Sequence, residues 1–195
     1  MKEQKLQDAY KLFDTANEQD PNTELYNGKA YPKELLYAQR MTSQLNKFEP
    51  EASIALKLAA RSQHICRWQI PRGNYEMNKV GYLKWRQELK NFHAEKASSI
   101  LMQLDFDKET IENVQFLLLK KQLKKNAETQ VLEDVICLVF LEFYFEAFAK
   151  EKNEEKLIGI LQKTWRKMSE KGQKAALELP LSDIGKALIK KALTE

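Results

Sequence analysis

The 195-residue sequence has few residues that interrupt regular structure, with only 6 glycines and 5 prolines. Its two cysteines, Cys66 and Cys137, are isolated and lack the spacing of a metal site, so we expect reduced thiols. Residues 1–10 contain no apolar stretch typical of a secretory signal, and the most apolar run, 135–148, is too short to span a bilayer. We therefore expect a cytoplasmic protein with no membrane partner.

Strict alternation of apolar and polar residues is also missing, which predicts essentially no β-sheet. Apolar residues instead recur at helical spacing, in segments separated by turn-forming stretches such as "NEQDPN" and "IPRGNYE". The predicted helices cover 5–18, 32–48, 50–68, 79–104, 107–118, 129–148 and 157–172, with a short last helix after Pro180. The predicted fold is a single all-α domain, residues 1–195, with seven to nine helices.

A strong excess of one charge is lacking as well, because 32 basic residues face 28 acidic residues and the net charge is +4. This balance is compatible with a small anionic ligand and falls short of a typical nucleic-acid binder. Basic residues do gather in one predicted hinge, at Lys120, Lys121, Lys124 and Lys125. These lysines are expected either to be solvated at a helix end or to contact RNA.

No nucleophile elbow, P-loop, dinucleotide fingerprint or cysteine-rich zinc motif occurs. The informative residues are polar groups inside apolar helical patterns: Arg61, His64, His93, Gln130, Glu133 and Asp134. In one interpretation they form a pocket in which two histidines and a carboxylate begin a metal or acid–base site. In the other they are a closed network, with Arg61 paired to Asp134 or Glu133 and the histidines hydrogen-bonded in the core.

The stretch "RWQIPRGNY" places two arginines and two aromatic residues on a loop or at its edge, where side chains are not needed for packing. The arginines beside Trp68 could hold an anionic or planar ligand. Alternatively, the aromatic residues anchor the loop and the arginines are solvated. The predicted ligand-binding set is Arg61, Arg67, Trp68, Arg72, Tyr75, Lys121 and Gln130.

Four long segments carry a family resemblance: "AARSQHICRWQIPRGNYEM", "GYLKWRQELKNFHAEKASSIL", "LLLKKQLKKNAETQVLEDVICLVFLE" and "KTWRKMS". Together they resemble the domain-of-unknown-function family 4202, and the resemblance runs from "FDTANEQDPN" to "LELP". This family brings no established activity. Some members carry a glutamyl-tRNA synthetase label, but the sequence has no Rossmann-type phosphate loop.

The pattern "HAEKASSILMQLDFDKETIENV", followed by "QVLEDVICL", is similar to a second group, the HD-domain superfamily. Its helical members are often metal-dependent phosphohydrolases. The resemblance implies an HD-like core over about 32–150, with the C-terminal helices of 153–195 packed on it. It also implies a hydrolase or lyase whose divalent-metal site is non-standard or absent.

Individual residues match the HD pattern only in part. Asp134 would match the last metal-ligand aspartate, and His93 a position that supports ligands or metal in some members. Gln63–His64, or His64–Ile65 in the other register, stands where a His–Asp pair is expected. Arg40 is near the place of the first metal-ligand histidine, so the usual metal set is incomplete.

These observations predict an enzyme or binding protein for a small phosphorylated or carboxylated ligand, nucleotide-derived ligands included. The predicted anion contacts are Arg61, Arg67 and Arg72. The predicted acid–base groups are His64, His93, Glu133 and Asp134, and a divalent metal would be held by His64, His93 and Asp134. The alternative is a non-catalytic helical module that binds RNA or a protein partner through the lysine-rich hinge and the Arg72 loop.

Overall fold

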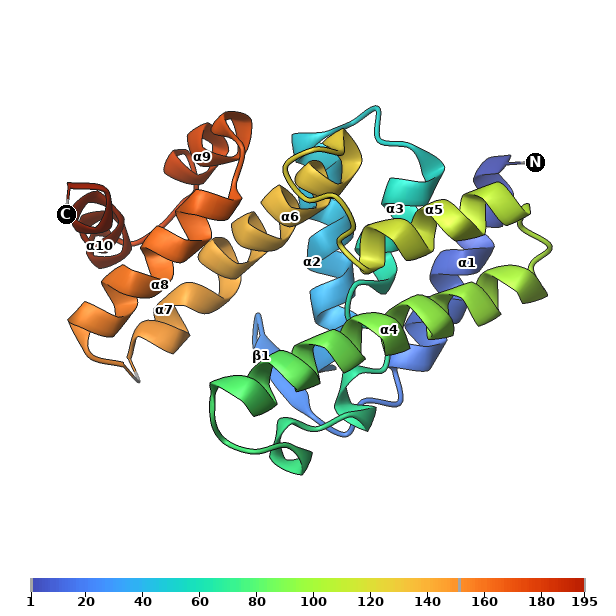
Figure 1. Cartoon of the computed structure of the whole chain (residues 1–195), viewed down its shortest axis with the longest axis horizontal. Helices are drawn as coiled ribbons and strands as arrows, with labels where there is room; N and C mark the ends of the chain where they lie inside the picture. The colour runs from blue at the N-terminus through green and yellow to red at the C-terminus, as the bar shows by residue number, and fades with distance from the viewer. Residues whose placement is uncertain (1, 151, 195) are drawn as a thin grey trace. The chain divides into compact units, whose positions relative to one another are not determined.

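The computed structural model describes residues 2–150 and 152–194, and within them it contains ten α-helices and one two-stranded sheet (Figure 1). The predicted all-α class is confirmed, with more helices than the seven to nine expected. The chain packs as two compact units. The first unit comprises Met1–Asn46 and Pro50–Lys121, and the second comprises Lys47–Glu49 and Gln122–Glu195.

Five α-helices and two 3₁₀ turns build the described part of the first unit. They are α1 (Lys2–Asn17), α2 (Lys33–Phe48), α3 (Ile54–Ser62), α4 (Lys79–Gln103), α5 (Lys108–Leu118), η1 (Arg67–Gln69) and η2 (Arg72–Asn74). Figure 1 shows α4 and α5 side by side, and α3 packs on α5 while α1 packs on α3 and α4. Asp107 begins α5 as predicted, because its carboxylate accepts a hydrogen bond of 2.8 Å from the amide of Thr110.

A short hairpin precedes α2, so the expectation of essentially no sheet was wrong for this segment. The strands β1 (Thr23–Tyr26) and β2 (Lys29–Pro32) pair in antiparallel register. Asn27 and Gly28 join them with φ of 49° and 75°, which is the left-handed backbone that a two-residue hairpin turn requires. The Asn–Gly dipeptide was the sequence signal for this turn.

The helix predicted over 50–68 is shorter than expected, because α3 ends at Ser62. The chain then turns sharply at Cys66, whose φ of 52° is left-handed. Two hydrogen bonds hold this turn: the Cys66 amide donates to Asn17 Oδ1 at 2.9 Å, and the carbonyl of Ile65 lies 2.9 Å from His93 Nδ1. The turn therefore joins α1, α3 and α4 at one point.

Five α-helices and a π-helical turn build the described part of the second unit. They are α6 (Ala127–Val139), η3 (Phe140–Tyr144), α7 (Phe145–Ala149), α8 (Glu154–Lys167), α9 (Glu170–Leu177) and α10 (Asp183–Thr194). The π turn divides the predicted 129–148 helix. The helix predicted to end near Gly172 ends at Lys167, because Ser169 caps a new helix by accepting the Gly172 amide at 3.0 Å.

The second unit packs α8 against α10 and α6, and α6 against α9. Within the residues that the structure describes, none of the helices has the length and apolar character needed to cross a membrane.

Candidate functional site

His64 lies in the first unit between a carboxylate and a guanidinium. Its Nδ1 is 3.1 Å from Glu34 Oε2, and its Nε2 is 2.8 Å from Arg67 Nη1. Because a guanidinium can only donate, Nε2 must accept and therefore carries a lone pair. The ring proton is then on Nδ1, where it donates to an ionised Glu34. The contacts thus define the tautomer of His64, and the nearby Arg67 guanidinium favours the ionised form of Glu34.

Aromatic rings border the group of Glu34, His64 and Arg67 on two sides. The Tyr37 ring stacks on His64 with centroids 4.0 Å apart and planes at 14°. The Arg67 guanidinium lies over the Trp85 ring, 4.9 Å from its centroid, while Trp85 Nε1 donates to the carbonyl of Ile70 at 2.8 Å. Tyr37 and Trp85 are buried, whereas the side chains of His64 and Arg67 are 21% and 27% exposed. Solvent can therefore reach part of these two side chains.

His93, on α4, completes the group with its ring 5.9 Å from that of His64. Its Nδ1 donates to the Ile65 carbonyl, which leaves Nε2 as an acceptor. This Nε2 atom is buried and has no hydrogen-bond partner within the described residues. Burial, followed by the neighbouring His64, lowers the pKa of His93 to about 3. The His64 cluster is hereafter Glu34, Tyr37, His64, Arg67, Trp85 and His93.

Asn17 and Asp20, at and after the end of α1, position the cluster. Asn17 is fully buried; besides accepting the Cys66 amide, it donates to the Glu34 carbonyl at 3.5 Å. Asp20 accepts the backbone amide of Glu34 at 3.0 Å and so satisfies the first turn of α2. Asn17 therefore holds both the start of α2 and the Cys66 turn, and Asp20 holds the start of α2.

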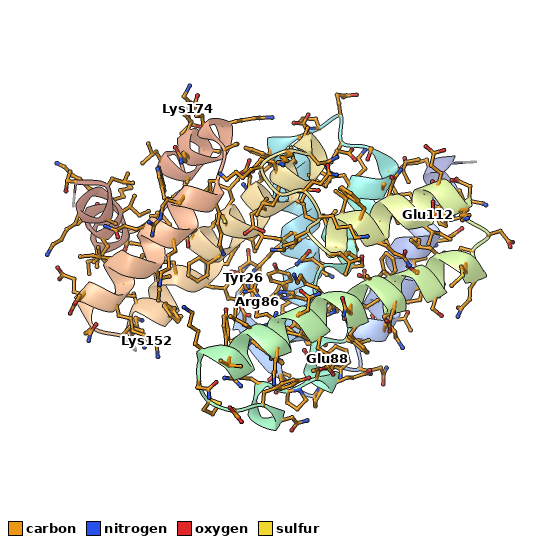
Figure 2. All side chains as sticks on the ribbon, viewed as in Figure 1. Tyr26, Arg86, Glu88, Glu112, Lys152 and Lys174 are labelled. Atoms are coloured by element: carbon orange, nitrogen blue, oxygen red, sulfur yellow. The ribbon has the colours of Figure 1, made fainter. Side chains whose placement is uncertain are left out.

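Four basic side chains act on His64. Burial lowers the pKa of His64 well below its usual range, and Arg67, Lys120, Arg86 and Lys33 lower it further. Arg86 projects from α4, where Figure 2 labels it. Burial raises the pKa of Glu34, while Arg67 and Lys33 oppose that increase. His64 is thus a neutral ring in a strongly positive environment.

Arg61 takes part in a different interaction from either one predicted. Its Nε and Nη2 donate to the two oxygens of Asp14 at 2.8 and 2.5 Å, and its Nη1 donates to Thr42 Oγ1 at 3.1 Å. The expected pairing with Asp134 or Glu133 was therefore wrong about the partner. This fork joins α1, α2 and α3, so the predicted burial of a charge on the apolar stripe of α3 has a structural explanation.

Arg72, in the predicted loop, uses its guanidinium mainly for hydrogen bonds to backbone carbonyls. Its guanidinium donates to the carbonyls of Tyr75, Glu76 and Asn78 at 3.0, 2.6 and 3.3 Å. Arg72 also lies 6.0 Å from the Trp85 ring, so the arginine pair is beside Trp85. The two predicted aromatic residues, Trp68 and Tyr75, are both half-buried near this loop.

Asp134 belongs to the second unit and anchors the start of α9. Its carboxylate accepts from Gln130 Nε2 at 3.0 Å, from the Ser169 amide at 2.8 Å and from Ser169 Oγ at 2.5 Å. Gln130 also donates to the Lys167 carbonyl at 2.9 Å. Glu133 is buried, 3.7 Å from Lys167 Nζ. These contacts give the carboxylates of α6 structural partners within their own unit.

Replacing Gly172 by alanine should destabilise the protein by about 1–3 kcal/mol. A Cβ at this position would lie 2.7 Å from the Asp134 carboxyl group, which its three hydrogen bonds hold in place. Gly159→Ala, in α8, is the matched control because a Cβ there meets nothing within 4 Å. That variant should be neutral or stabilising by up to about 1 kcal/mol. Urea unfolding of both variants measures the difference, and equal stabilities would contradict the anchoring role of Asp134.

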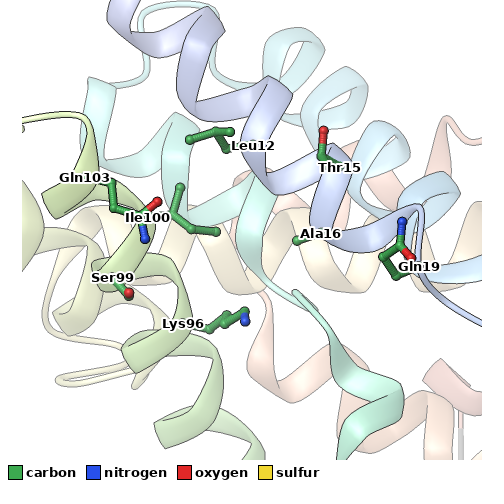
Figure 3. Close-up of a pocket in the computed structure, with 8 residues that line it drawn as sticks. All are labelled: Leu12, Thr15, Ala16, Gln19, Lys96, Ser99, Ile100 and Gln103. Atoms are coloured by element: carbon green, nitrogen blue, oxygen red, sulfur yellow. The ribbon is translucent and has the colours of Figure 1, made fainter.

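A groove of about 450 Å³ lies between α1 and α4 in the first unit (Figure 3). Leu12, Ala16 and Ile100 form its apolar part, with Lys96 on its polar side. No member of the His64 cluster lines it. The nearby Cys66 thiol contacts the Ala16 carbonyl, and burial raises the pKa of that thiol, so it is a packed and unreactive group.

A metal centre needs several ligand side chains around one point. Among the side chains that the structure describes, no group of three or more His, Cys, Asp or Glu residues could hold a metal ion. His64 and His93 are neighbours in the first unit, whereas Asp134 has its partners in the second.

Sequence reasoning missed Glu34, Tyr37 and Arg86. The signal for Glu34 was an acidic residue in the first turn of a helix, which the helix dipole explains without any site. Tyr37 falls on the apolar stripe of α2, and Arg86 on the polar side of α4, so neither breaks its pattern. Lys121, a predicted ligand contact, is exposed at the end of the first unit.

Comparison with known proteins found one family. The model described as Domain of unknown function (DUF4202) matches residues 7–189, which confirms the first resemblance seen in the sequence. No curated protein and no solved structure gave a match. The resemblance to the HD-domain superfamily stays a prediction.

Proposed function

We propose that this chain, which belongs to the DUF4202 family, binds a small phosphorylated or carboxylated ligand at the His64 cluster. The observation that carries the proposal is the Arg67 guanidinium, which lies 2.8 Å from His64 Nε2 and 4.9 Å from the Trp85 ring centroid on a side chain that is 27% exposed. Lys33, Arg86 and Lys120 add positive charge around the same ring. Positive potential of this kind attracts an anion, and the partly exposed edge of Arg67 offers it a donor.

The chemistry of Arg67 favours phosphate or carboxylate over a simple halide. A guanidinium presents paired N–H donors that match two oxygens of one ligand group. The Arg67 guanidinium lies over the Trp85 ring, and Glu34, 3.9 Å from Nε, competes only weakly at that distance. An anion arriving at the exposed edge would therefore gain bidentate contacts at modest cost.

Calorimetric titration at low salt tests this proposal with inorganic phosphate, pyrophosphate, AMP and citrate as probes. Arg67→Gln should weaken binding at least about tenfold, because it removes a charged hydrogen-bond donor, and Arg86→Gln should weaken it less. The matched control is Arg166→Gln, an exposed arginine of α8, which should bind as the wild type does. Wild-type affinity in a folded Arg67→Gln variant, or no binding of any probe at millimolar concentration, would overturn the proposal.

The alternative is a helical module that binds RNA or a protein through basic surface residues. Lys121 and Lys125 are exposed, which suits such contacts. Two other members of the predicted surface hold the backbone, since Arg72 binds three carbonyls and Lys124 donates to the carbonyl of Met168 at 3.1 Å. RNA binding would weaken steeply with salt and would survive Arg67→Gln, unlike the site proposed above.

A further inference from the structure

The two nitrogens of His64 have opposite neighbours, and this arrangement suits proton transfer. Glu34 accepts the Nδ1 proton at 3.1 Å, as a carboxylate does when it orients a histidine base. The basic atom, Nε2, is covered by Arg67 at 2.8 Å. The ring is oriented as a base, but Arg67 occupies the lone pair on Nε2. Arg67 is also the residue that would hold the anion.

We propose that His64 is a general base whose Nε2 is released when an anion binds Arg67. This inference rests on the proposed anion site and defines its ligand further. The ligand carries a phosphate or carboxylate for Arg67 and, close to it, an O–H group that reaches Nε2. Hydroxylated phosphates and hydroxy acids are the chemical class that fits.

The surroundings hold the base in place more firmly than they hold the group that covers it. The His64 ring is stacked on Tyr37 and hydrogen-bonded to Glu34, and the following backbone is held by the Cys66 and Ile65 hydrogen bonds. The Arg67 guanidinium is held through Nη1 to His64, the Trp85 ring and a 3.9 Å ion pair. Oxygen atoms of an anion would compete directly for that Nη1 donor.

The proton transfer balances without a further reactant. The O–H bond of the ligand breaks, its proton forms the Nε2–H bond, and the electron pair stays on the ligand oxygen. The resulting imidazolium donates from Nδ1 to Glu34, which compensates its charge. The oxyanion forms next to Arg67, whose positive charge stabilises it.

The charges around the ring set how strong this base is. The groups facing it are Lys33, Glu34 and Tyr37 from α2, Arg67 from η1, Arg86 and His93 from α4, and Lys120 after α5. Burial, and after it the cations among these groups, keep the pKa of His64 low in the free protein. A bound anion offsets these charges, so the pKa of His64 should rise towards its ordinary value when the ligand is present.

Nitrogen-15 NMR of the full chain with labelled histidine tests the inference, because the chain has only two histidines. Inorganic phosphate should shift the His64 Nε2 resonance and raise the pKa of His64 by about one unit or more. His93, whose Nδ1 is bound to a carbonyl, should keep its tautomer when phosphate is added. In Arg67→Gln both changes should exist before phosphate is added, and phosphate should add little. Arg166→Gln should respond as the wild type does.

The outcomes separate the two proposals. If phosphate binds by calorimetry but leaves His64 unchanged in the wild type, the release of Nε2 is refuted while the anion site stands. If Arg67→Gln leaves the His64 resonances unchanged, Arg67 does not cover the base and the inference is also refuted. If no probe binds, both proposals fall together.

Discussion

Replacing Arg61 by alanine should lower the free energy of unfolding by about 2–4 kcal/mol, while the folded variant still binds phosphate. The side chains of Arg61 and Asp14 are 11% and 23% exposed, so truncation leaves a largely buried carboxylate without its fork of donors. The variant also loses the hydrogen bond to Thr42 and the contact of the guanidinium with the Tyr10 ring. The expected loss of stability is smaller than for a fully buried ion pair, because water screens the exposed part of this pair.

Urea unfolding measures this loss, and a double-mutant cycle with Asp14→Asn isolates the pair. Arg166→Ala is the matched control, since an exposed arginine should change stability by less than about 0.5 kcal/mol. A nearly neutral Arg61→Ala would contradict the role of Arg61 in packing α1, α2 and α3. A folded variant that no longer binds phosphate would show that Arg61 also serves the site.

Mild acid should destabilise the protein through its buried histidines. The free energy of unfolding should fall by about 3 kcal/mol between pH 7.5 and pH 4.5 from His93 alone. In the unfolded chain this histidine takes up a proton near pH 6.5, whereas in the folded chain it stays neutral down to about pH 3. The unfolded state therefore binds more protons in this window, and stability decreases as the pH falls.

The other buried groups modify this profile in known directions. His64 adds to it, because its folded pKa is also lowered. Glu34 opposes it, since its raised folded pKa gives stability at low pH that is lost as the pH rises through that pKa. Urea unfolding at a series of pH values gives the slope, and His93→Gln should flatten it by up to about one proton. A wild-type profile without slope between pH 6.5 and pH 4.5 would contradict the neutral, buried state of the histidines.

Local sequence patterns were sufficient to predict most of the helices. They were insufficient to predict which side chains pair between helices. The apolar spacing along α4 and the Asp107 cap of α5 are local properties, and the structure agrees with both. Arg61 was correctly expected inside an apolar stripe, but its partner Asp14 is 47 positions away. Which charge meets another across the core depends on tertiary packing, and periodicity carries no information on it.

The candidate site shows the same division. His64 and Arg67 stood out because a helix that must bury one face needs an explanation for basic groups so close together. Glu34 did not stand out, because the helix dipole already explains an acidic residue in the first turn of a helix. Asp134 stood out as a charged group inside an apolar pattern, but its three donors on Gln130 and Ser169 became visible only when the break before α9 was known.

The last turn of α2 limits where the chain can be divided without splitting one of its two units. Residues Lys47–Glu49 count with the second unit, where Lys171 bonds Glu49 and lies 4.5 Å from the Phe48 ring. The second unit is therefore discontinuous in sequence, and no single cut of the gene yields both units whole. A cut after Lys121 would separate residues 47–49 from Lys171, which they contact. The family match over 7–189 spans both units as one continuous segment.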